Sequence, residues 1–301
     1  ARIHSNSWGS PVYGEYTYDS YEADTFVWNH KDFVILFAAG NEGTDSDGDG
    51  VIDYGSINSP GTAKNVITVG ACENNRPTMI RIDNDADGNI DEDPLNWDVF
   101  GNPIDDDGDN AGHPFNADGL DNDGDGQVDE GDEGINEDPP ETYSRWWWDY
   151  PANPIANDAM ADDPDGMVAF SSRGPCNDGR IKPDVVAPGT WVLSTRSSVA
   201  SGTGWGIYNQ YYMYMGGTSM STPLTAGACA LIRQYYMEYR SHTPSASLIK
   251  ATLINGAVDM PGQYTPDETG PTPNNNEGWG RVDLANSIFP TPPKVLLFED
   301  N

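Results

Sequence analysis

Continuous apolar runs along the chain predict short strands buried inside a sheet. Residues 33–39 are apolar throughout and end at Gly40, and residues 65–70, Asn-Val-Ile-Thr-Val-Gly, form a second, mostly apolar run. Extended character returns over residues 185–188 and 191–194. Unbroken runs, in place of alternating apolar and polar positions, are typical of strands that are buried on both faces in a parallel sheet.

Two longer stretches, residues 218–239 and 245–255, predict helices. We expect Pro223 in the first turn of the earlier helix, where a proline is tolerated. The later helix has Pro244 before it and Gly256 after it, which are typical boundary residues. Short strands that alternate with helices predict an α/β fold with a central, mainly parallel sheet.

An acidic stretch interrupts this pattern. Of the 48 Asp and Glu residues, 22 lie between Arg81 and Arg145, where there is no Lys or Arg, so the formal net charge of −33 arises mostly there. This charge argues against nucleic acid and against an anionic membrane surface as partners. No apolar run reaches the roughly 18 residues of a membrane span.

These changes in composition divide the chain into four parts. A core over residues 1–82 contains a short acidic loop at 45–53, and an acidic insert follows over residues 83–145. A second core part covers residues 146–289, and a Pro-rich linker to a missing C-terminal region covers residues 290–301. The chain has three cysteines, Cys72, Cys176 and Cys229. They are either small buried apolar side chains, or two of them form one disulfide.

Ser219 is the candidate nucleophile. A glycine-rich turn, Gly216-Gly217, leads into the predicted helix and places this serine in its first turn. Free N–H groups and the positive end of the helix dipole would stabilise negative charge that develops there. Taken alone, a serine after Gly-Thr at a helix start is more often only an N-cap.

Residues 217–224 read Gly-Thr-Ser-Met-Ser-Thr-Pro-Leu and resemble the signature Gly-Thr-Ser-Met-Ala-x-Pro-His of the subtilase family of serine proteases. Ser221 replaces the usual Ala, and Leu224 replaces a His that is not the triad base. The resemblance implies a subtilisin-like three-layer fold, truncated at its N-terminus, and a serine endopeptidase that acts by acyl transfer through Ser219. Other segments match motifs of the family in the family's order along the chain, at residues 37–43, 59–61, 66–71, 170–175, 182–189 and 278–283.

The resemblance also implies roles for residues outside the nucleophile segment. Asn41 would donate its side-chain amide in the oxyanion hole, although a Gly-Asn pair after a strand also suits an ordinary turn. The segment at residues 3–9, which ends in Ser-Trp-Gly, would pair with an extended peptide substrate. The alternative is that it is a plain edge strand. The substrate-binding residues implied in this way are Ser7, Trp8, Gly9, Ala39, Gly40 and Thr218.

The acid and base of the family's triad are absent from the motifs found here. Subtilases place them in the order Asp, His, Ser, so we expect both upstream of residue 1, in a missing N-terminal part of the same domain. We therefore expect this chain alone to be nearly inactive. No family motif surrounds any of the four histidines, which are His4, His30, His113 and His242.

Three acidic segments repeat one spacing, with Asp at positions 1, 3, 5 and 9 and Gly at position 6. Alternate carboxylates and a turn glycine suit Ca²⁺, and the segments resemble EF-hand-like and thrombospondin type 3-like loops. The twelfth-position Glu is absent, which favours helix-free loops; a solvated acidic linker is the alternative. The candidate ligands are Asp45, Asp47, Asp49, Asp53, Asp83, Asp85, Asp87, Asp91, Asp121, Asp123, Asp125 and Asp129.

The sequence thus predicts a secreted, calcium-binding serine endopeptidase that acts on peptide or protein substrates. Two alternatives remain open. The fold could serve binding only, as a pseudoprotease, or the chain could be a calcium-dependent extracellular binding or structural module.

Overall fold

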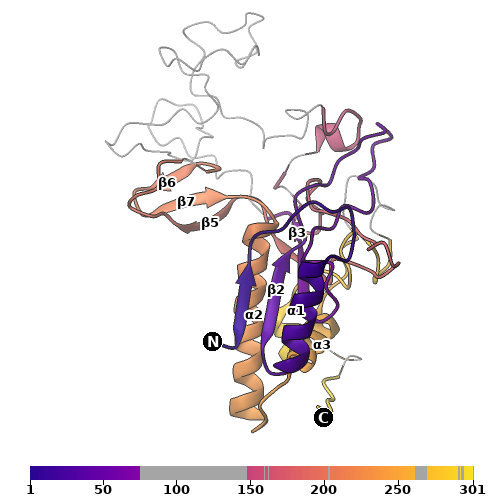
Figure 1. The fold of residues 1–301 in the computed structure, drawn as a ribbon. Coiled ribbons are helices and arrows are strands. Elements are labelled where there is room, and N and C mark those ends of the chain that lie inside the picture. Colours follow the sequence, from indigo (N-terminus) through magenta and orange to yellow (C-terminus); the bar gives the residue numbers. More distant parts are fainter. Residues whose placement is uncertain are drawn as a thin grey trace, which may run out of the picture. The chain divides into compact units, whose positions relative to one another are not determined.

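The computed structural model of the chain describes residues 1–74 and 148–300 (Figure 1). Within the second range, the residues left undescribed are 159, 162, 203, 262–269, 291, 293 and 294. The described residues fall in two compact units. One unit comprises residues 1–74, 148–190 and 216–300, and the other comprises residues 191–215.

Four parallel strands form the sheet of the first unit. Leu36 lies opposite Ile67, and Val69 lies opposite Val185, which fixes the register of the central strands. The predicted α/β fold with a mainly parallel sheet is therefore confirmed. In order across the sheet, the strands are β1 (Ile3–Asn6), β2 (Val34–Ala38), β3 (Ile67–Cys72) and β4 (Val185–Pro188).

Helices cover both faces of this sheet, which makes three layers. Figure 1 shows α1 (Tyr18–Asn29) in front of the strands and α2 (Thr218–Tyr239) behind them. α2 packs along all four strands, and it also contacts α3 (Ala246–Gly256) and α4 (Leu284–Ile288). A short 3-10 helix, η2, covers Ile155–Asn157. Among the described residues, none of the helices is both long and apolar enough to cross a membrane.

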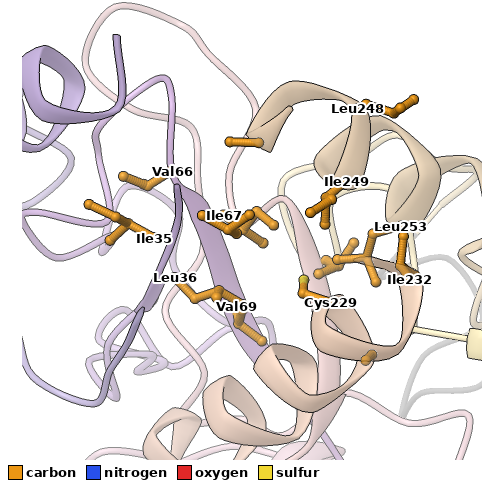
Figure 2. Packing of buried hydrophobic residues seen from close by; sticks show 14 of the residues in the cluster. Ile35, Leu36, Val66, Ile67, Val69, Cys229, Ile232, Leu248, Ile249 and Leu253 are labelled. Atoms are coloured by element: carbon orange, nitrogen blue, oxygen red, sulfur yellow. The ribbon is translucent and has the colours of Figure 1, made fainter. Parts of the chain in front are cut away.

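The core lies between the sheet and the helices behind it. Every residue of β2 and β3 is buried, as the unbroken apolar runs predicted. Figure 2 shows Ile67 and Val69 of β3 on the side of Ile232, Ile249 and Leu253 from α2 and α3. Burial of each such side chain contributes roughly 1.5–3 kcal/mol, so this packing fixes α2 on the sheet.

The position of Pro223 within α2 differs from our expectation. The helix begins at Thr218, which places Pro223 in the second turn instead of the first. A proline there has no N–H for the carbonyl one turn earlier, which belongs to Ser219. The helix continues past this defect because its packing along the sheet, more than its local propensity, holds it.

The three cysteines are free and buried, so no disulfide joins them. Burial raises the pKa of Cys72 to about 12, and it raises the pKa of Cys229 to about 12 as well. Both thiols therefore stay protonated near neutral pH and act as small apolar side chains.

The second unit is a small antiparallel sheet. β5 (Val192–Thr195) pairs with β7 (Tyr212–Met215), which also pairs with β6 (Ile207–Asn209). The rings of Trp191 and Trp205 meet edge to face at 4.7 Å. The predicted extended stretch after residue 190 is thus a strand, although it belongs to this separate sheet.

Residues 295–300 fold back onto the first unit. The ring of Phe298 lies 4.8 Å from that of Tyr236 near the end of α2. Asp300 Oδ2 lies 2.8 Å from His242 Nε2 and accepts a hydrogen bond from the Ser245 amide, also at 2.8 Å. These residues belong to the stretch that we interpreted as a linker, and the domain boundaries stay a prediction.

A buried group of charges joins the sheet to α3. Lys182 Nζ lies 2.7 Å from Asp184 Oδ2, and Lys250 Nζ lies 2.8 Å from Asp184 Oδ1. Lys182 also donates to Thr68 Oγ1 at 2.7 Å. Burial opposes ionisation of Asp184, but the two lysines outweigh it and hold the pKa of this carboxyl below its usual range. The carboxylate therefore stays charged and bridges both lysines.

We expect Asp184→Asn to lower the free energy of unfolding by about 3 kcal/mol, because it leaves Lys182 buried without a counter-charge. Urea unfolding followed by circular dichroism measures this change. The control is Asp32→Asn, which breaks an exposed pair with Arg2 and should cost less than about 1 kcal/mol. Equal losses in the two variants would contradict the role given to the buried group.

Candidate active site

Ser219 lies in the first turn of α2 and is partly exposed. The N-cap of the helix is Gly217, with a φ of +126°, which a residue with a Cβ rarely adopts. The Gly217 amide donates to the Gly189 carbonyl at 2.7 Å, which ties the turn to the end of β4. The alternative in which Ser219 is only an N-cap is therefore wrong, because another residue occupies that position.

Asn41 lies against the same turn. Its Oδ1 accepts hydrogen bonds from the Thr218 amide at 2.9 Å and from Thr218 Oγ1 at 3.0 Å. The amide nitrogen Nδ2 therefore points away from Thr218, and it lies 3.4 Å from where a Cβ on Gly217 would be. An amide donor held beside a helix N-terminus is what an oxyanion hole requires.

Gly40 allows Asn41 to reach this position. Its φ of +116° suits glycine, and an added Cβ would come within 2.6 Å of Asn58 Nδ2 and of Ser172 Oγ. The Gly40 carbonyl also accepts from Thr218 Oγ1 at 3.3 Å. Before it, the buried Ala39 amide donates to the Val69 carbonyl, which continues the pairing of β2 with β3.

The end of β1 borders the nucleophile turn as well. Ser7 Oγ donates to the carbonyl of Ser219 at 2.7 Å. Trp8 is exposed, and its indole nitrogen donates to Asn6 Oδ1 at 3.2 Å. An added Cβ on Gly9 would lie 3.0 Å from the Ser59 carbonyl. The structure thus places the predicted substrate segment next to Ser219. The functional roles assigned to this segment, to Ser219 and to Asn41 stay predictions.

Three residues around Gly40 were missed by the sequence-based prediction. Ser172 Oγ donates to Glu42 Oε2 at 3.1 Å and accepts from the Glu42 amide at 3.2 Å. Asn58 donates its amide N–H to the Ala39 carbonyl at 2.8 Å. Ser172 lies in a recognised motif at residues 170–175, but no spacing in the sequence indicated that it supports a segment 130 residues earlier.

The described histidines have partners other than Ser219. His4 Nδ1 lies 3.2 Å from Asn6 Nδ2, and His30 Nδ1 lies 2.9 Å from the Phe26 carbonyl. His242 contacts Asp300. His113 lies outside the described residues. That none of the four serves as the base stays a prediction.

The first acidic loop brings its carboxylates together. One oxygen from each of Asp45, Asp47 and Asp49 lies within 4.8 Å of the others. Asp45 is buried, and its two oxygens accept from the amides of Asp49 at 3.0 Å and Gly50 at 3.1 Å. Asp53 is bound instead to the Ser46 amide at 2.9 Å. Outside the described residues lie Asp83, Asp85, Asp87, Asp91, Asp121, Asp123, Asp125 and Asp129.

The sequence profile of the Subtilase family (Peptidase S8) matches residues 1–280. The chain belongs to the subtilase family. This subtilase chain is similar to proteins named serine protease/ABC transporter B family proteins in Dictyostelium discoideum. It is 28% identical to tagD over 96% of its length, and 29% identical to tagB over 97%. It spans only 16% of the length of each.

Three further similarities concern one bacterial relative and two solved structures. The subtilase chain is 38% identical to the C5a peptidase of Streptococcus pyogenes serotype M18, over 42% of the chain and 10% of that protein. The solved prenylagaramide maturation protease PagA gives a TM-score of 0.49 at 16% identity, over 96% of this chain and 61% of that one. The patellamide maturation protease PatA gives 0.48 at 15% identity, over 96% and 62%.

We expect Gly40→Ala to destabilise the subtilase fold far more than Gly179→Ala. Both glycines have positive φ, which costs an L-residue roughly 1–2 kcal/mol. Only at Gly40 would the new methyl group also collide with neighbours, because nothing lies within 4 Å at Gly179. Thermal unfolding of the two variants tests this, and equal melting temperatures would show that the surroundings of Gly40 yield easily.

Proposed function

We propose that this subtilase chain carries the nucleophile half of a serine endopeptidase site, with Ser219 as nucleophile and Asn41 as oxyanion donor. The observation that carries the proposal is the pair of hydrogen bonds from Thr218 to Asn41 Oδ1. They orient the amide of Asn41 and hold it beside the residue that would attack. A residue in a plain turn would have no need of this orientation.

In the proposed reaction, Ser219 Oγ attacks the scissile carbonyl carbon while its proton passes to a base. The electron pair of the carbonyl moves onto its oxygen, where Asn41 Nδ2–H and the main-chain amide of Ser219 donate hydrogen bonds. Collapse of this intermediate expels the amine, which takes up the proton. Water then releases the acyl group by the same steps.

The outer surface of α2 supports a further part of the domain. α2 carries no charged residue before Arg233, and Leu224 and Leu231 on its outer face are 46% and 48% exposed. About four helical turns without a charge, with large apolar side chains on the outer face, are typical of a helix that is covered on both sides. Among the described strands β1 pairs with β2 alone, which leaves its other edge open.

We propose that the upstream part of the parent protein covers both surfaces and supplies the catalytic Asp and His. Without it, this chain alone would be nearly inactive. The peptide or protein substrate would lie as an extended strand beside Ser7, Trp8 and Gly9, because main-chain hydrogen bonds recognise a peptide of any sequence.

We expect a fluorophosphonate probe to label Ser219 in the full-length parent, and Ser219→Ala to abolish the labelling. Asn41→Ala should slow labelling about 100-fold, because the oxyanion loses one donor. Labelling is read by gel fluorescence and by mass spectrometry of the modified peptide.

The matched control is Ser221→Ala, two residues along the same helix. Ser221 is buried and its hydroxyl donates to the Ala187 carbonyl, so labelling should persist. If the full-length parent protein is folded but takes no label, the protease assignment is wrong, and a pseudoprotease or a calcium-dependent binding module is favoured.

We also propose that the acidic loop at residues 45–53 binds Ca²⁺ in an extracellular setting. Its support is the convergence of Asp45, Asp47 and Asp49, together with oxygen-only ligands that suit a hard cation. The loop glycines Gly48 and Gly50 have φ of +73° and +83° and allow the tight turn. The segments at 83–91 and 121–129 share the spacing and are proposed as further sites.

We expect a chelator to lower the melting temperature of the chain, because a site held at about 100 times its Kd adds roughly 2.7 kcal/mol to stability. Asp47→Asn should reduce the number of calcium ions bound per chain by one, as counted by equilibrium dialysis. Asp32→Asn removes the same charge from an exposed ion pair and should leave that number unchanged. An unchanged melting temperature after chelation would rule the proposal out.

A further inference from the structure

The carbonyl of the nucleophile residue has lost its normal partner in the helix. In an α-helix each carbonyl accepts from the amide four residues later. For Ser219 that residue is Pro223, which has no N–H. Leaving a carbonyl without a hydrogen-bond donor in a partly buried turn costs free energy of folding, so another donor is expected to bind it.

Ser7 supplies the missing donor. Its hydroxyl donates to the Ser219 carbonyl at 2.7 Å, from a position 212 residues earlier in the chain. Ser7 directly follows β1, whose last residue, Asn6, lies opposite Phe37 in β2 and donates its side-chain amide to the Leu36 carbonyl at 3.1 Å. The hydroxyl therefore directly follows a strand that is hydrogen-bonded to β2.

Two contacts from the sheet thus hold consecutive residues of the first turn. Asn41 Oδ1 accepts from Thr218, and Ser7 Oγ donates to Ser219. One contact satisfies the amide of the Gly217–Thr218 peptide unit and the other the carbonyl of the Ser219–Met220 unit, so together they hold the backbone on both sides of the nucleophile. Removing either would leave the turn free to rotate about the other.

We propose that Ser7 is a positioning residue, whose hydroxyl replaces the amide that Pro223 lacks and so aims Ser219. This inference rests on the proposed function, because it assumes that Ser219 attacks. A displacement of the attacking atom by about 1 Å can cost on the order of 100-fold in rate. A hydroxyl that only contacted substrate would change binding instead.

The experiment measures fluorophosphonate labelling of the full-length parent at several probe concentrations. Ser7→Ala should lower the maximal labelling rate about tenfold, equivalent to about 1.4 kcal/mol of barrier, and change the half-saturating probe concentration less than twofold. In a Pro223→Ala background, where residue 223 regains an amide, Ser7→Ala should cost less than twofold. Ser5→Ala, on β1, is the matched control and should label as the wild type.

An isosteric pair keeps the test decisive even if Pro223→Ala disturbs the helix. Ser7→Thr retains the hydroxyl and should label within about threefold of the wild type, whereas Ser7→Val, of the same shape, should match Ser7→Ala. Equal rates for the Thr and Val variants would overturn the proposal, as would equal losses from Ser7→Ala in both backgrounds. A wild-type parent that takes no label would instead refute the proposed function.

Discussion

The hydrogen bonds from Thr218 to Asn41 Oδ1 join the start of α2 to the end of β2, and the arrangement of the site depends on that junction. The buried strands place the end of β2, and the packing of α2 along the sheet places its first turn. Gly40 and Gly217 then bring the two backbones close together through conformations with positive φ. The site therefore depends on the core, because the same buried strands that form the core also place Asn41 and Ser219 side by side.

Much of this framework could be predicted from the sequence. Unbroken apolar runs indicated β2, β3 and β4, because a strand buried on both faces leaves a signal that needs no partner to interpret. The start of α2 followed from a glycine pair, and the predicted range, residues 218–239, matches the observed helix. The family motifs named Ser219 and Asn41, and the structure places them against one turn. The acidic segments gave a spacing that the described loop at 45–53 brings into a cluster.

The rest depended on contacts between distant parts of the chain. Nothing in the sequence joins Ser172 to Glu42, or Asp184 to Lys250, because a hydrogen bond or ion pair across the fold leaves no periodic pattern. The helix was correctly predicted to begin at residue 218, but Pro223 is its sixth residue and so lies beyond the first turn of about 3.6 residues, where we had expected it. The segments at 83–91 and 121–129 lie outside the described residues, so their ligands stay predictions.

The segment at residues 295–300 has a practical consequence for choosing where a recombinant domain stops. Asp300 accepts from Ser245 at the start of α3, and Phe298 contacts Tyr236 near the end of α2. A shorter version that ended at the prolines near residue 290 would uncover an aromatic ring and remove the hydrogen-bond partner of His242 and of the Ser245 amide. We expect such a product to be less stable than the longer domain, for reasons unrelated to catalysis. The fold-back therefore sets the shortest useful length of this domain at its C-terminal side.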